Sequence, residues 1–158
     1  MSRNAIQIHG VDSLVQRLDH MRAQLTVKSP EIAGEIANVI RDKAEDGYSE
    51  AESEIHVDVT RKGNRASVTA EGEEVTFYEF GAGVYYNGNI SPHPKAAELG
   101  FRIGEYGKGK GKQKAWGYKD KNGNLVITRG TKATLAMYNA SKVGKEKAEE
   151  IARRKLHE

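Results

Sequence analysis

The sequence contains no cysteine among its 158 residues, so disulfides, thiolate metal ligands and cysteine nucleophiles are excluded. It also has no apolar run approaching the roughly 18 residues that a membrane-spanning helix requires. The N-terminal stretch from Met1 to Gly10 lacks the apolar core of a signal peptide. These absences fit a cytoplasmic setting, and we expect no membrane partner.

Aromatic residues are also few, at 7%, and a hydrophobic fraction of 37% supports only a lean core. We expect a single domain over 1–158, with a flexible loop at about 85–114. The net charge of +3 is small but unevenly distributed. Lysines dominate from Lys108 to Lys121, whereas Glu45–Glu54 contains acids and no base. This asymmetry suits a subunit that contacts two unlike neighbours.

Helical periodicity predicts three helices. Apolar residues at spacings of four, three and four predict a helix over about 12–27, with the stripe Leu14, Leu18, Met21 and Leu25. Ser29-Pro30-Glu31 is typical of a helix start, so we expect a second helix over about 30–47, ending at Gly47. A face of small residues predicts a C-terminal helix over about 132–155.

Alternation of apolar and polar residues predicts two hairpins. The first pairs Ile55–Val59 with Ala66–Ala70, and the second pairs 115–118 with 125–128 across a tight turn at Asn122-Gly123. Antiparallel hairpins beside helices indicate an α+β fold, in which two N-terminal helices and one C-terminal helix pack on an antiparallel sheet. The expected core is Ile55, Val57, Val59, Val68, Leu125 and Ile127 from strands, with Leu14, Leu18, Ile36, Ile40, Met137 and Ile151 from helices.

The titratable residues do not form a convincing catalytic or metal-binding pattern. No two of the five histidines lie at metal-ligand spacing on one helix, and His93, between prolines, is interpreted as a loop residue. Glu79 and Glu98 could form a hydrolytic carboxylate pair. However, Glu79 is better explained as an acceptor for backbone N–H groups of the glycine turn that follows it. We therefore expect a structural turn, and no catalytic residue, metal or cofactor, at Glu79, Phe80, Gly81 and Gly83.

The alternating glycines and lysines of Gly107–Lys112 suggest a phosphate cradle. The tract lacks the Ser or Thr and the following helix that a P-loop requires. It is interpreted as a solvated loop that becomes ordered in an assembly. Two alternatives stay open: a non-specific nucleic-acid-binding module that uses the basic 108–121 segment, and a small hydrolase.

Several short motifs, taken in order, resemble a family of tailed-phage proteins. They are Glu79-Phe80-Gly81-Ala82-Gly83, Pro92-His93-Pro94, Glu98-Leu99-Gly100, Tyr106-Gly107, Trp116-Gly117-Tyr118, Thr128-Arg129-Gly130 and Met137-Tyr138-Asn139. Together they resemble the gene-product-ten-like family, described as head–tail connector, tail-completion or minor tail proteins, most densely over residues 75–141. The chain departs from that family at Ala82, where threonine is usual, and at Lys132, Leu135 and Ala136, where prolines and a phenylalanine are usual.

The resemblance implies a non-enzymatic structural protein of the virion neck or tail, made in the host cytoplasm. It implies a homo-oligomeric ring, expected to be a hexamer, that docks onto other neck or tail proteins and encloses a channel for DNA. The lysines of the loop have two candidate partners, the acidic Glu45–Glu54 of an adjacent copy and the DNA in the channel. Predicted subunit or partner contacts are Tyr85, Tyr86, His93, Lys108, Lys110, Lys112, Lys114 and Trp116.

Overall fold

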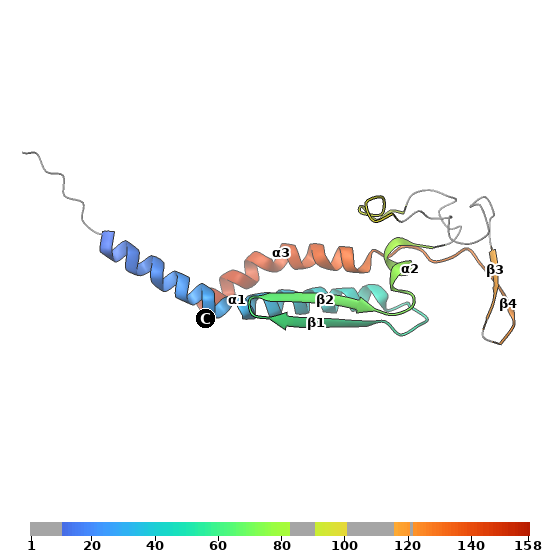
Figure 1. Cartoon of the computed structure of the whole chain (residues 1–158), viewed down its shortest axis with the longest axis horizontal. Coiled ribbons are helices and arrows are strands. Elements are labelled where there is room, and N and C mark those ends of the chain that lie inside the picture. The colour runs from blue at the N-terminus through green and yellow to red at the C-terminus, as the bar shows by residue number, and fades with distance from the viewer. Residues whose placement is uncertain (1–10, 83–90, 101–115, 121) are drawn as a thin grey trace, which may run out of the picture.

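The structure is a computed structural model that describes residues 11–82, 91–100, 116–120 and 122–158. In chain order its elements are α1 (Val11–Tyr48), β1 (His56–Lys62), β2 (Arg65–Glu71), α2 (Val75–Phe80), β3 (Trp116–Lys119), β4 (Leu125–Thr128) and α3 (Ala136–His157). Figure 1 shows an elongated molecule in which α3 and the β1–β2 hairpin both lie along the C-terminal part of α1. The helices and antiparallel hairpins place the chain in the α+β class. No helix in these described ranges has the length and apolarity needed to cross a membrane.

The N-terminal region is one helix, so the prediction of separate helices over 12–27 and 30–47 is wrong. Pro30 lies inside α1. A proline removes one backbone N–H and therefore leaves only the carbonyl of Thr26, four residues earlier, without its helical partner. Thr26 and Pro30 are both exposed, so water can bind that carbonyl while the helix continues. The bend of α1 in Figure 1 is typical of a helix that contains proline.

The first predicted hairpin is confirmed. β1 and β2 pair antiparallel from His56↔Glu71 to Lys62↔Arg65. The two-residue connection contains Gly63, whose φ of 58° suits a residue without a Cβ. Alternate residues of β1 face α1, and Val57 is buried there.

The second hairpin forms, but its turn differs from the prediction. β3 and β4 pair antiparallel, with Lys119 opposite Leu125, so the connection is longer than Asn122-Gly123. The Asp120 carboxylate organises it by accepting the backbone N–H groups of Asn122 and Asn124 at 2.9 and 2.8 Å. The two hairpins remain separate two-stranded sheets rather than one sheet.

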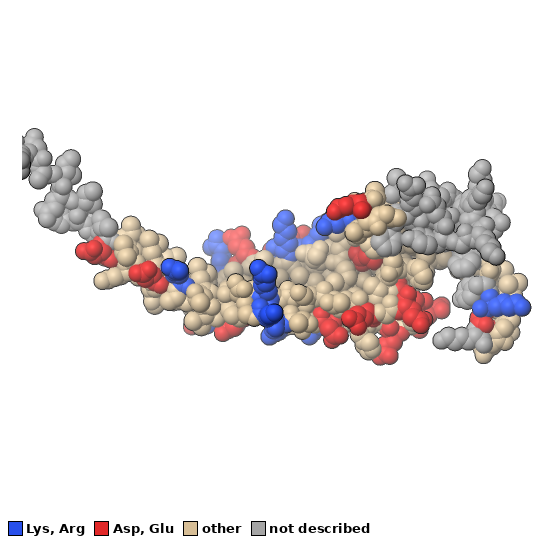
Figure 2. Space-filling model, viewed as in Figure 1, with Lys and Arg blue, Asp and Glu red and all other residues tan. Residues whose placement is uncertain are grey.

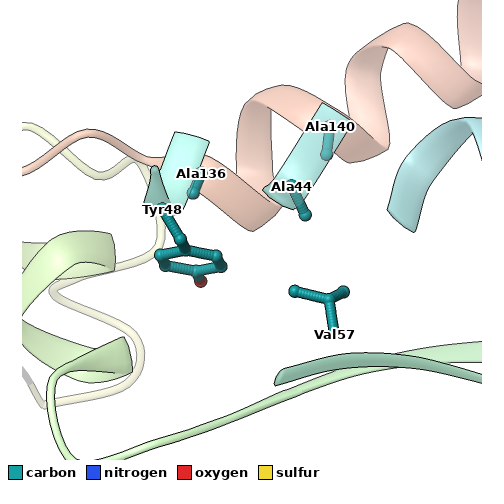
Figure 3. Close-up of a cluster of buried hydrophobic side chains, with 5 residues drawn as sticks. All are labelled: Ala44, Tyr48, Val57, Ala136 and Ala140. Atoms are coloured by element: carbon teal, nitrogen blue, oxygen red, sulfur yellow. The ribbon is translucent and has the colours of Figure 1, made fainter. Parts of the chain in front are cut away.

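The core is small and built largely from alanine. Its buried cluster, shown in Figure 3, consists of Ala44, Tyr48, Val57, Ala136 and Ala140. Small residues let α1 and α3 approach closely, because a Cβ on Gly144 would lie 2.4 Å from Ile40 Cγ1. Gly47, which was expected to end the helix, lies within α1, and a Cβ there would lie 2.6 Å from the Cβ of Ala136.

Most residues of the predicted core are at least half-buried, and five of the twelve lie in or beside this cluster. Eight of the twelve are buried or half-buried, namely Ile36, Ile40, Ile55, Val57, Val59, Val68, Met137 and Ile151. The prediction is wrong for Leu14 and Leu18 of α1 and for Leu125 and Ile127 of β4, which are 55–68% exposed. Periodicity identified their helix and strand correctly, but no described element covers those faces.

Candidate functional site

The start of α3 is fixed by a side chain from another element. The residue before the helix, Leu135, has a left-handed backbone conformation and offers no side-chain acceptor to the free N–H groups of the first turn. Glu79, at the end of α2, accepts two of these N–H groups, one with each oxygen of its carboxylate. Its Oε2 accepts the backbone N–H of Met137 at 2.9 Å, and its Oε1 accepts that of Tyr138 at 2.9 Å. A carboxylate at this position also matches the positive end of the helix dipole.

The backbone on either side of this cap is held as well. The Tyr78 carbonyl accepts the N–H groups of Thr134 and Leu135 at 2.7 and 3.3 Å. Ala82 and Thr131 exchange two backbone hydrogen bonds, of 2.9 and 3.1 Å. The chain entering α3 is thus bound to the chain leaving α2, which explains why the helix begins at Ala136 rather than at the predicted 132.

His93 completes the Glu79 site. Its Nε2 lies 3.2 Å from Glu79 Oε1, and its Nδ1 accepts the backbone N–H of Lys95 at 3.1 Å. With Nδ1 as an acceptor, the proton belongs on Nε2 and points at the carboxylate. The ring lies between two aromatic rings, with centroids 4.5 Å from Phe80 and 5.2 Å from Tyr138.

The segment that carries His93 packs against the body, although 85–114 was predicted to be a flexible loop. Ser91, His93 and Ala96 are all buried. The Ser91 hydroxyl donates to the Phe80 carbonyl at 2.5 Å and accepts the backbone N–H of His93 at 3.2 Å. These hydrogen bonds hold the segment in place although the surrounding sequence is rich in glycine. Apolar periodicity could not predict them because they involve polar groups. His93 lies outside the helices and strands, as predicted, but it is a buried partner of Glu79 and is not exposed for contact with another protein.

One buried polar group near the site has no hydrogen-bond partner in the described part of the chain. The Tyr48 hydroxyl comes from the end of α1, and the Tyr48 and Tyr78 rings meet edge to face with centroids 6.4 Å apart. Burial raises the pKa of Tyr48 well above its ordinary value of 10.0, and the nearby Glu79 carboxylate raises it further. Tyr48 thus stays neutral beside the Glu79 carboxylate.

We call the cluster of Glu79, Phe80, Ser91, His93 and Tyr138 the α3 joint. It unites three of the short motifs noted in the sequence, those around Glu79, His93 and Tyr138. The prediction that Glu79 accepts backbone N–H groups is confirmed, but the donors belong to α3 and not to the glycine turn. Ser91 was missed because an isolated serine carries no pattern. Tyr48 was missed because it follows Gly47, where the helix was expected to end.

Several predicted site residues lie outside the described residues. They are Gly83 of the predicted turn and, among the predicted contacts, Tyr85, Tyr86, Lys108, Lys110, Lys112 and Lys114, together with the side chain of Trp116. Glu98 is described and exposed, and neither a hydrogen bond nor an ion pair joins it to Glu79.

The α3 joint is suited to holding segments together. Both oxygens of Glu79 are occupied by backbone donors, and the side chains of Glu79 and His93 are only 9% and 6% exposed. A bound substrate would have to displace these contacts and open the start of α3. Among the described residues, no group of three or more His, Asp or Glu side chains could hold a metal ion. No family model matches the chain, and no curated protein or solved structure matches it.

Proposed function

We propose that this chain is a structural subunit of the neck or tail of a tailed bacteriophage, which forms a ring with other copies and docks onto neighbouring ring proteins. The observation that carries the proposal is the α3 joint. Residues that bear the resemblance in three separate segments, Glu79, His93 and Tyr138, contact one another in space. Motifs that build one shared structural feature support a common fold better than isolated motifs do.

The chemistry of the joint agrees with a structural role. Its carboxylate caps a helix and its histidine is enclosed by aromatic rings, so its polar groups are satisfied within the subunit. A subunit of a large assembly needs a rigid body from which contact segments extend. The α3 joint supplies that rigidity by binding α2, the 91–96 segment and α3 to one another.

The exposed apolar surface also supports a role in assembly. Ten large apolar side chains in the described part are exposed, and six of them lie on the first half of α1: Leu14, Val15, Leu18, Met21, Leu25 and Val27. Four of these, Leu14, Leu18, Met21 and Leu25, lie on one face of the helix, and apolar surface gathered in this way marks an interaction site. A subunit that joins others would bury it in the particle.

Deleting the coding sequence from the phage or prophage that carries it tests the proposal. Electron microscopy of the lysate should show filled heads and tails made separately, and expression of the wild-type chain in trans should restore tailed particles. Normal tailed particles from the deletion would contradict the proposal.

The predicted contact residues give a second test. Replacing Lys108, Lys110, Lys112 and Lys114 with serine and supplying this chain in trans separates a subunit contact from a DNA contact. Failure to form rings or joined particles would indicate a subunit contact. Normal assembly of DNA-free rings or tails with failed DNA retention would indicate DNA binding, which should weaken steeply with added salt.

A further inference from the structure

The first half of α1 is a helical arm that extends from the body. Every residue from Asp12 to Val27 is exposed, whereas Ala37, Ala44 and Tyr48 in the second half are buried. Figure 1 shows this arm, in blue, projecting beyond α3 and the β1–β2 hairpin. A helix of this length is marginal in water unless its apolar face is packed. The arm therefore needs a partner surface.

Four of the six exposed apolar side chains of the arm form one narrow stripe, and Val15 and Val27 lie outside it. At about 100° per residue, Leu14, Leu18, Met21 and Leu25 fall within an arc of about 60°. They are 47–57% exposed. Their spacing of four, three and four is that of a seam that packs against one other element. The stripe spans about 16 Å along the helix, at about 1.5 Å per residue.

The charges beside the stripe are positive. Arg22 lies about 40° beyond one edge and Arg17 about 40° beyond the other, whereas Asp12 and Asp19 lie toward the opposite face of the helix. Neither arginine forms an ion pair within the described part of the chain. A copy of the same arm is an unfavourable partner because pairing two stripes brings arginines together without carboxylates between them. The stripe requires an apolar surface bordered by acids.

The end of the molecule opposite the arm, around α2, offers an apolar surface bordered by acids. Figure 2 shows acidic side chains gathered over the ends of β1 and β2 beside α2. Five exposed carboxylates there have no ion-pair partner in the described residues: Glu45, Glu50, Glu52, Glu71 and Glu73. Phe77 of α2 is 47% exposed at the same end. The pKa of the neighbouring Tyr78 is raised by burial and then by Glu74, Glu52 and Glu50, which indicates a concentrated negative potential.

We propose that the arm of one copy docks its apolar stripe on the acidic end of a second copy, around Phe77. Leu18 and Met21 would cover the Phe77 ring, and Arg17 and Arg22 would pair with the carboxylates beside it. The two surfaces are unlike and lie at opposite ends of one elongated chain, so the contact is head-to-tail and repeats from copy to copy. This contact deepens the ring assembly proposed above and rests on it.

Two complementary variants of the full chain test the contact by sedimentation velocity and native mass spectrometry. Leu18→Ser with Met21→Ser removes the stripe, and Glu50→Lys with Glu52→Lys and Glu73→Lys inverts the acidic end. Each variant alone should associate more weakly by roughly 100-fold or more, about tenfold for each anchor lost. Mixing the two should produce a 1:1 heterodimer, because the intact arm of one fits the intact acidic end of the other.

The matched control is Gln16→Ser with Ala23→Ser, which changes the opposite face of the same helix and should leave association unchanged. Circular dichroism of every variant checks that the fold is retained. A wild-type chain that stays monomeric would overturn the proposal. So would a mixture in which only the acidic-end variant pairs with itself, which indicates an arm-to-arm contact. Binding of the arm to vesicles containing phosphatidylserine, without self-association, would identify a membrane surface as its partner instead.

These measurements use purified chain, and the deletion test uses phage particles, so the two proposals can fail separately. Separate heads and tails in the deletion, together with variants that associate normally, would overturn the arm contact alone. Normal tailed particles in the deletion would overturn the phage role, whatever the purified chain does.

Discussion

The two hairpins of this molecule have similar alternation but different surroundings. β1–β2 packs against α1, which buries Val57 and half-buries Val59 and Val68. β3–β4 lies beyond α2 in Figure 1, and Leu125 and Ile127 on β4 are 68% and 65% exposed. An isolated two-stranded hairpin is at best marginally stable in water. A strand therefore adds to the stability of the body only where another element covers its apolar face.

The largest effect is expected at the α3 joint, on the stable side of this comparison. Glu79→Ala leaves the N–H groups of Met137 and Tyr138 without their acceptor and removes the partner of His93. Because hydrogen bonds to a charged group are stronger than neutral ones, we expect a loss of about 3 kcal/mol in the free energy of unfolding. Urea denaturation monitored by circular dichroism measures it.

Glu98→Ala is the matched control, since this exposed carboxylate has no hydrogen bond or ion pair in the described structure. It should change stability by less than about 0.5 kcal/mol. Equal effects of the two substitutions would show that Glu79 does not cap α3.

A somewhat smaller loss is expected from closing the contact between the two long helices. A Cβ on Gly144 would lie 2.4 Å from Ile40 Cγ1, so Gly144→Val forces α1 and α3 apart. Overpacking of this kind costs about 2 kcal/mol. Ser141→Val is the control: it places the same side chain at an exposed position of α3, and serine and valine have similar helix propensities. Thermal unfolding should separate the two variants, and similar melting temperatures would mean that Ile40 can move aside.

A matched pair of substitutions tests the hairpin comparison directly. Val57→Thr places a hydroxyl in the buried cluster and should cost about 1–2 kcal/mol, since burying an unpaired hydroxyl is unfavourable. Ile127→Thr places the same group on an exposed face and should cost less than about 0.5 kcal/mol. Both replacements keep a β-branched side chain, so strand propensity changes little. If Ile127→Thr proves the more damaging, the apolar face of β4 must be covered, for example by another copy.

Sequence patterns predicted the helices and strands better than they predicted what packs against each of them. Spacing identified the helical segments of α1 and α3 and both hairpins, since those patterns reflect local geometry. No pattern predicted the short helix α2 (Val75–Phe80). The patterns could not show that α1 continues through Pro30, because that depends on whether water can bind the Thr26 carbonyl. Nor could they show that the faces carrying Leu14, Leu18, Leu125 and Ile127 lack a cover. Whether another element packs on a face is a matter of tertiary structure, which alternation and helical spacing do not determine.

The α3 joint was predicted only in part for a similar reason. A carboxylate before a glycine turn indicated that Glu79 accepts backbone N–H groups, and it does so. The donors lie more than fifty residues away, so no local rule could name them. The resemblance placed Glu79, His93 and Tyr138 in one pattern, but only the structure shows that they touch. Long-range polar contacts of this kind need coordinates.

The smallest effect at neutral pH is expected from Tyr48→Phe. The Tyr48 hydroxyl is buried and has no hydrogen-bond partner within the described residues. Its removal should leave the free energy of unfolding unchanged or raise it by up to about 1 kcal/mol. Tyr78→Phe is the matched comparison, because the Tyr78 hydroxyl donates to the Glu50 carbonyl at 2.7 Å and its loss should lower stability by about 1 kcal/mol.

Tyr48→Phe should also differ from the wild type in alkali. Burial, followed by the Glu79 carboxylate, raises the pKa of Tyr48 in the folded chain above its ordinary value of 10.0, so the folded state favours the neutral phenol. That contribution is fully present below pH 10.0 and is lost as the unfolded chain ionises above it. Tyr48→Phe should therefore lose less stability than the wild type between neutral pH and strongly alkaline pH. Urea denaturation at a series of pH values measures the difference. An alkaline loss identical to that of the wild type would show that folding does not raise the pKa of Tyr48. A clear loss for Tyr48→Phe at neutral pH would show that the hydroxyl has a partner.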